Sequence, residues 1–186
     1  MKKLIWIDVG THFAQEHTSI YGSNFAFYLF VLKRFLSGKI LKRGKFVSYK
    51  ELKEIIVSRK ILRSRSADVF SIFIEANPRI VHKKDFYPQA DIVFNLALTD
   101  AGHAPVSIAK LYIGNGGELA EGNSLFKQKH KTEVKDYVAT FGISTNDFFK
   151  QLELYLSEKF ENYSVMLRLN CEGVEDEVIY AAYQSF

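Results

Sequence analysis

The stretch LIWIDVGTHFAQ, residues 4–15, decides the fold that this sequence predicts. Residues 4–9 form an apolar run that only Asp8 interrupts, which is typical of a strand buried on both faces of a parallel sheet. The run ends at Asp8-Val9-Gly10, where the glycine permits a tight turn. Open α/β sheets bind their ligands at this carboxyl edge, so the turn is a candidate binding loop. Strands also end this way for turn reasons alone, and the motif by itself leaves both interpretations open.

Three more runs of this kind follow along the chain. They are VFSIFI at 69–74, DIVFNLAL at 91–98 and VMLRLN at 165–170, and each stops at polar or glycine residues. After the second run, Asn77 is a good N-cap and Pro78 suits the first turn of a helix. This alternation of strand and helix predicts an α/β fold with a mostly parallel sheet.

The segment between the third and fourth runs has a different pattern. Residues 106–113 and 134–141 are candidates for extended structure, and the glycine cluster at 114–117 predicts a turn, so we expect an inserted antiparallel hairpin. Thr145-Asn146-Asp147 then predicts the start of a helix to about Phe160, with a capping residue and an acid in its first turn. The apolar residues of this helix fall on one face.

Residues 33–65 form a strongly basic segment. They include twelve Lys or Arg and two Glu, a net charge of +10, whereas the whole chain carries +4. A lysine-rich face is most often solvated surface. The alternative is an electrostatic platform for an anionic partner, which would be a phosphate-bearing acceptor, a nucleic acid or an anionic membrane.

The basic segment belongs to a region that interrupts the first strand-helix-strand unit. A second helix is predicted at about 49–62, and an earlier apolar stripe has the spacing of a helix buried in a core: Phe25, Tyr28, Leu29, Leu32 and Leu36. We therefore expect a single domain, residues 1–186, with a basic and mainly helical insertion at about 22–66.

Composition and cysteine content narrow the class of protein. Hydrophobic residues make up 47% of the 186 residues, which is enough for one packed domain. The single cysteine excludes an internal disulfide and suits a reducing compartment. The first apolar run is too short for a signal peptide, and no run approaches the ~20 residues of a membrane span. Five scattered histidines make a zinc site improbable, so we expect a cytoplasmic protein without a metal.

Two other strand ends carry polar residues to the same edge as Asp8. Glu75 follows the second run, and a carboxylate there can accept hydrogen bonds from a ribose diol. Taken alone, Glu75 fits slightly better as an acid that stabilises the N-terminus of the next helix. The sequence RLNCEGVE at 168–175 ends the fourth run, and its alternative is a polar loop before a helix. Glu75 taken together with the first motif favours a ligand. The dinucleotide fingerprint is excluded, because His12 and Gln15 stand where it needs glycine.

As an ordered set, these motifs resemble those of the FkbM-type S-adenosylmethionine-dependent methyltransferases. The matching stretches are DVGTHFAQ, IEANP, NLALTD and LRLNCEGVE, where the family reads D-V-G-A-N-x-G-Q, F-E-P-x-P, N-x-A-L-S-D and K-I-D-x-E-G-x-E. NSLFKQK and STNDFF also look like the family's hairpin tip and helix start. The resemblance covers most of the chain except residues 20–66. It implies a class I methyltransferase-like (Rossmann-like) fold, S-adenosyl-L-methionine as cofactor, and O-methylation of a hydroxyl on a sugar or other small metabolite, so that the partner would be a small-molecule or glycan acceptor.

The resemblance also implies roles for individual residues. The methionine end of the cofactor pocket would be shaped by Asp8, Gly10 and Thr11. Glu75 would hold the ribose, and the adenosine and adenine would be bordered by Ala76, Asn77, Ala97 and Leu98. The methyl-transfer centre would be faced by the two catalytic candidates, Asn170 and Glu172.

This sequence departs from the family pattern at three of these positions. Ala14 replaces the second glycine and Ala76 replaces a proline, while Asn170 replaces the aspartate and cannot serve as a carboxylate base. After the fourth run only about 14 residues remain, whereas three further strands of the full fold would need on the order of 50. We expect a fragment, a truncated relative or an incomplete sheet. The alternative function is a catalytically degenerate domain that binds an anionic partner through its basic insertion.

Overall fold

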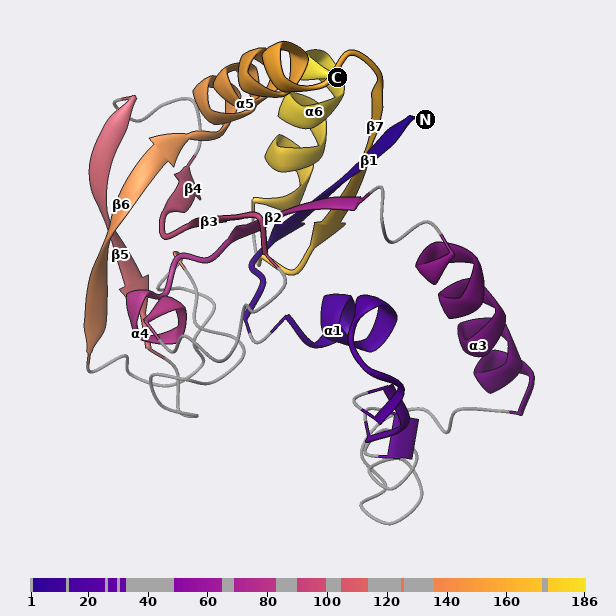
Figure 1. Cartoon of the computed structure of the whole chain (residues 1–186). Coiled ribbons are helices and arrows are strands. Elements are labelled where there is room, and N and C mark those ends of the chain that lie inside the picture. The colour runs from indigo at the N-terminus through magenta and orange to yellow at the C-terminus, as the bar shows by residue number, and fades with distance from the viewer. Residues whose placement is uncertain are drawn as a thin grey trace. The chain divides into compact units, whose positions relative to one another are not determined.

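The computed structural model describes residues 2–12, 14–25, 27–29, 31–32, 49–64, 69–82, 90–99, 105–113, 125, 136–171 and 174–186 (Figure 1). The chain divides into two compact units. We call residues 1–13 and 70–186 the sheet unit, and residues 14–69 the helical unit. The helical unit contains the insertion expected at about 22–66, and the assignment of both units to a single domain stays a prediction.

The sheet unit is built on a four-stranded sheet. Its strands, in spatial order, are β3 (Ile92–Phe94), β2 (Val69–Ile74), β1 (Lys3–Val9) and β7 (Tyr163–Leu169). β1 pairs in parallel with β7, and β2 pairs in parallel with β3. The expected α/β class with a mostly parallel sheet is confirmed, and three of the four strands lie within two residues of their predicted bounds.

The third predicted strand, 91–98, is wrong. It is split into β3 and the short strand β4 (Ala97–Thr99), which belong to different sheets. Between them, the amide nitrogen of Asn95 donates hydrogen bonds to the carbonyl oxygens of Glu75 (2.8 Å) and Ala76 (3.4 Å). Asn95 thus ties the chain to the end of β2, and the strand ends there although its flanks are apolar.

A second, smaller sheet contains the expected hairpin strands. Its order is β4, β6 (Tyr137–Ser144) and β5 (Val106–Tyr112), with β5 antiparallel and β4 parallel to β6. The antiparallel insertion is therefore confirmed. Its expected turn at 114–117 lies outside the described residues.

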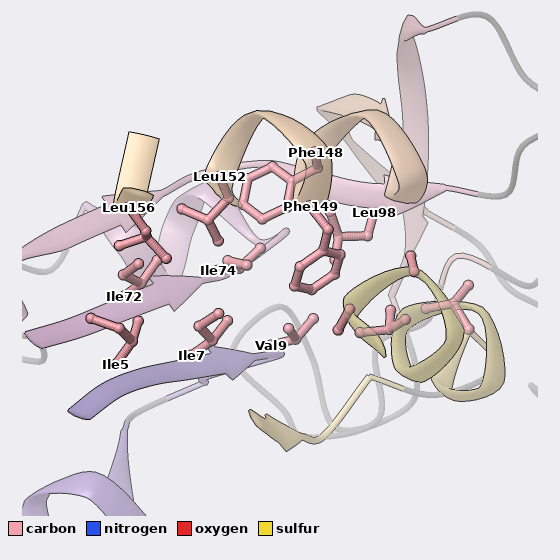
Figure 2. Close-up of a cluster of buried hydrophobic side chains, with 14 of the residues drawn as sticks. Ile5, Ile7, Val9, Ile72, Ile74, Leu98, Phe148, Phe149, Leu152 and Leu156 are labelled. Atoms are coloured by element: carbon pink, nitrogen blue, oxygen red, sulfur yellow. The ribbon is translucent and has the colours of Figure 1, made fainter. Parts of the chain in front are cut away.

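Two helices complete the core of the sheet unit. Helix α5 (Thr145–Lys159) begins one residue after Ser144, whose hydroxyl caps it, and helix α6 (Glu175–Ser185) follows β7. The expected apolar face of α5 is buried through Phe148, Phe149, Leu152 and Leu156. Figure 2 shows these side chains pointing toward those of β1 and β2. Alternate residues of β1 (Ile5, Ile7, Val9) face this core, and Trp6 and Asp8 between them are also buried, as a strand buried on both faces requires.

The helical unit contains α1 (Gln15–Tyr21) and α3 (Tyr49–Arg63), and α3 confirms the helix predicted at 49–62. The described residues between 24 and 32 are also mostly helical, but the expected core stripe is wrong where it can be seen. Its residues are exposed: Phe25, Tyr28, Leu29 and Leu32; Leu36 lies outside the described residues. Phe27 is buried instead, and the guanidinium carbon of Arg59 lies over its ring, 4.5 Å from the centroid. No helix in the described parts of the chain is long and apolar enough to span a bilayer.

Candidate functional site

The carboxyl ends of β1, β2 and β7 meet at one edge of the sheet through backbone hydrogen bonds. The amide nitrogens of Gly10 and Thr11 both donate to the carbonyl oxygen of Ile74, at 2.9 and 3.3 Å. On the other side, Asn170 N donates to Val9 O at 2.9 Å. The loop after β1 is therefore held between the two neighbouring strand ends. The structure brings together the three motifs that the sequence placed at this edge.

Asp8 is fully buried at this edge and is paired with a cation. Its Oδ1 lies 2.8 Å from Nη1 of Arg168, which stands directly opposite it in the parallel register of β1 and β7. The same nitrogen reaches the carbonyl oxygen of Gly10 at 3.3 Å. A buried carboxylate needs such a partner, since leaving it unpaired costs about 3–5 kcal/mol. Arg168 thus neutralises Asp8 and fixes the loop. No role for Arg168 could be predicted from the sequence, because only the strand register shows that it faces Asp8.

Gly10 is required by the approach of another strand. Its φ is +70°, and a Cβ built on it would lie 2.4 Å from the carbonyl oxygen of Asn170. No side chain fits at that distance. The close backbone approach seen in the structure is therefore made by the chain's own β7 end, and it locks the two strand ends together.

Two residues without the freedom of glycine also have left-handed backbone conformations in this turn. His12 and Ala14 both have φ of +49°. Such a conformation costs an L-residue about 1–2 kcal/mol, and asparagine and glycine adopt it most readily. The FkbM pattern D-V-G-A-N-x-G-Q has asparagine and glycine at these two positions. His12 and Ala14 therefore leave the turn in place but make it strained.

Glu75 joins the loop after β1 to the loop after β2. Its Oε2 accepts a hydrogen bond from His12 N at 2.7 Å, and its Oε1 accepts one from Asn77 N at 2.8 Å. The side chain is 7% exposed. Burial raises the pKa of the Glu75 carboxyl above its ordinary value, and the backbone donors of Asn77 and His12 oppose this rise without reversing it. A carboxylate has about four lone-pair sites, so these two bonds leave acceptor capacity for a ligand diol.

The residues expected around the adenosine have structural roles as well. Asn77 is buried and caps the short helix α4 (Pro78–Val81), where its Oδ1 accepts from Arg79 N at 3.0 Å. Ala97 and Leu98 are buried in β4, and Leu98 packs in the hydrophobic core with the side chains of α5 (Figure 2). Thr11 is buried too, and its hydroxyl donates to the carbonyl oxygen of Asp8 at 2.8 Å.

Of the two catalytic candidates, Asn170 and Glu172, only Asn170 lies within the described residues. Asn170 is exposed directly after β7, with its backbone tied to Val9, whereas Glu172 lies outside the described residues. The Asn170 amide can donate and accept hydrogen bonds but cannot remove a proton as a carboxylate does. Within the described ranges, no group of three His, Cys, Asp or Glu side chains could hold a metal ion.

Comparisons with protein-family models, with curated proteins and with solved structures give no match for this chain. The features that bear on function are the strand ends of the sheet unit. They bring three groups to one carboxyl edge: the buried acid Asp8 before the turn at Gly10, the neighbouring acid Glu75 with spare acceptor capacity, and the exposed amide of Asn170.

Proposed function

We propose that this chain is an S-adenosyl-L-methionine-dependent methyltransferase that modifies a hydroxyl oxygen of a sugar or other small metabolite. The observation that carries the proposal is the position of Glu75 beside the left-handed turn after β1. The strand order supports it, because β3-β2-β1-β7 corresponds to the 3-2-1-4 part of a doubly wound sheet. Such sheets bind their ligand where the order reverses, which is here beyond the ends of β1 and β7.

The residues at this edge fit the chemistry of the cofactor. Glu75 would accept hydrogen bonds from the two ribose hydroxyls while it still holds His12 N and Asn77 N. The adenosine would lie along the loop after β2, bordered by Ala76, Asn77, Ala97 and Leu98. The methionine end would lie over Gly10 and Thr11, and Asp8 would act through Arg168 by keeping this loop in place. When bound, the cofactor supplies an electrophilic methyl group for in-line displacement.

The chain's own contribution to transfer would be orientation and proton removal. In this proposal, the Asn170 amide orients the acceptor hydroxyl by hydrogen bonding, since its neutral side chain cannot accept the proton. Glu172, which follows two residues later, is the carboxylate assigned to that task.

A second candidate function is that of a catalytically degenerate domain, which binds an anionic partner through the basic insertion. The specific observation that favours it is the neutral Asn170, exposed where the family pattern has an aspartate. Conversion of Asn170 to Asp separates the two candidates. It should raise methyl transfer to a hydroxyl acceptor if the edge is catalytic, and it should leave transfer absent if the edge only binds.

Calorimetric titration with S-adenosyl-L-methionine tests both candidates. We expect saturable binding to the intact chain, loss of binding in Glu75→Ala, and unchanged binding in Glu158→Ala, which removes an exposed acid from α5. Because Glu75→Ala also leaves two backbone donors without their acceptor, Glu75→Gln serves as the milder variant and its thermal unfolding is followed in parallel. Absence of binding in the intact, folded protein would contradict the methyltransferase proposal.

A further inference from the structure

The helical unit contains a pocket that the proposed function does not use. Its volume is about 380 Å³, within the roughly 300–1,000 Å³ typical of small-molecule sites. All of its lining residues belong to this unit: Asn24, Phe27, Tyr28, Ile56, Arg59, Lys60, Arg63 and Ser64. Three cations thus line one pocket together with an amide, a hydroxyl and two aromatic rings.

Arg59 has a structural role that explains its presence. Its Nε donates to Ser19 O at 2.8 Å, and its Nη2 lies 3.2 Å from Gly22 O, so it binds carbonyl oxygens at the C-terminal end of α1. The guanidinium also stacks on the ring of Phe27 at 4.5 Å. Arg59 therefore joins α3 to α1 and forms a rigid wall of the pocket.

Arg63 joins α3 to Asn24, whereas Lys60 shows no side-chain hydrogen bond or ion pair within the described part of the chain. Arg63 Nη1 donates to Oδ1 of Asn24 at 2.7 Å, and Arg59 Nη1 donates to the same oxygen at 3.1 Å. One neutral oxygen therefore holds two guanidinium groups, and Lys60 lies on the same helix. Among the side chains that the structure describes, no carboxylate forms an ion pair with any of these three cations.

The environment of Arg59 disfavours its charged form. Burial and the neighbouring charge of Arg63 both lower the pKa of Arg59. Like charges that share one acceptor repel each other, and an anion seated between them would remove that repulsion. Arginine in a forked arrangement is also the side chain best matched to phosphate oxygens. No described acid offsets the charge of these cations, and their charge and forked geometry both favour a phosphate.

We propose that this pocket binds the phosphate group of a small phosphorylated molecule. The phosphate lies against Arg63 and Lys60, with Asn24 as a further donor through its amide nitrogen. The organic part of the ligand rests on Tyr28 and Ile56, whose side chains are 65% and 46% exposed at the pocket. Among the lining residues that the structure describes, only Tyr28 presents an exposed ring, and one ring beside a pocket of this volume suits a small ligand better than the repeated aromatic platforms that bind single-stranded nucleic acid.

The first test is a titration of the full chain with inorganic phosphate and with phenyl phosphate at low ionic strength. Both should bind saturably, and phenyl phosphate should bind more tightly if the organic part contacts Tyr28; equal affinities would leave free phosphate as the ligand.

Arg63→Gln and Lys60→Gln should each weaken binding roughly tenfold, which is the usual worth of one charge-assisted hydrogen bond. Lys53→Gln is the matched control, because Lys53 is exposed on the same helix and does not line the pocket. It should leave the affinity unchanged.

The second test replaces Asn24 by Asp. This variant keeps the shape and the acceptor oxygen, so both arginines retain their hydrogen bonds, but it places a negative charge where the phosphate would act. Phosphate binding should be lost while the melting temperature stays the same or rises, which a purely structural cluster would not show. The proposal is overturned if neither phosphate compound binds, or if binding survives in N24D and in R63Q. It is also overturned if an oligonucleotide binds through these residues while both small phosphates do not. Titration with S-adenosyl-L-methionine should be unaffected by N24D, which keeps this test independent of the methyltransferase proposal.

Discussion

The carboxyl edge of the sheet and the pocket of the helical unit differ in how their charged side chains are paired. At the edge, Asp8 is matched by Arg168, and Glu75 is matched by the backbone donors of His12 and Asn77. In the pocket, by contrast, Arg59 and Arg63 share one neutral amide oxygen. The paired charges at the edge stabilise one conformation of the loop after β1. The neighbouring cations in the pocket repel each other, and a bound anion would relieve that repulsion.

The largest expected effect comes from breaking the compensation at the edge. Arg168→Met would leave the buried carboxylate of Asp8 without its cation, and we expect a loss of about 3–5 kcal/mol in the free energy of unfolding by urea. Adding Asp8→Asn to this variant should recover part of the loss, because the uncompensated charge is then gone. A loss below about 1 kcal/mol in the single variant would show that the pair behaves like an exposed ion pair.

Next in size is the close approach of the two strand ends. Gly10→Ala would place a Cβ 2.4 Å from Asn170 O in a residue with positive φ. The expected destabilisation is about 2–3 kcal/mol. Gly142→Ala is the comparison at a position without a positive φ: its Cβ would meet side-chain atoms only, the Ser107 hydroxyl at 2.8 Å, Thr99 Cγ2 at 3.1 Å and Ala109 Cβ at 3.3 Å. Equal losses in the two variants would remove the special role assigned to Gly10.

A smaller and opposite effect is expected from relieving the strained turn. Ala14→Gly should stabilise the protein by up to about 1 kcal/mol, because glycine adopts the left-handed conformation without the steric cost that alanine has. The control is Ala139→Gly in β6, which should lose about 0.5–1 kcal/mol as glycine does in a regular strand. Thermal or urea unfolding of both variants measures the difference in sign. Loss of stability in both would mean that the turn is not strained.

The smallest effect is the dependence of stability on pH that Glu75 contributes. Because burial raises the pKa of Glu75 in the folded chain, its stabilising contribution is fully present below the ordinary glutamate pKa and is lost as the pH rises through the raised value. The melting temperature of the wild type, relative to that of Glu75→Gln, should therefore fall as the pH rises through the raised pKa of Glu75. A relative melting temperature that does not change with pH would mean that the carboxyl does not titrate in the range measured.

The sequence predicted the parts of this fold that depend on local pattern. The buried strands, the cap at Asn77 and the apolar face of α5 follow from residue type and spacing. The break at Asn95 was missed because the amide's partners, the carbonyls after β2, lie twenty residues away in the chain. Likewise, the pairing of Arg168 with Asp8 appears only once β7 is placed beside β1 in register.

The helical unit was predicted less well for a related reason. Its apolar stripe has regular helical spacing, yet Phe27, one position away from Tyr28, is the ring that is buried. The deciding contact is the guanidinium of Arg59, which comes from α3. The pocket likewise depends on which face of α3 meets Asn24. Neither contact leaves a pattern in the sequence of one segment.

The central claim is that the carboxyl edge binds S-adenosyl-L-methionine through the Glu75 carboxylate, and titration of the intact chain at a series of pH values tests it most directly. Ribose hydroxyls donate to the charged form of Glu75, so we predict saturable binding at pH values above the raised pKa of this group and weaker binding as the pH falls through it. Thermal unfolding of the same sample reports that the protein is folded at each pH. Absence of any binding of S-adenosyl-L-methionine to the folded protein at every pH would contradict the account.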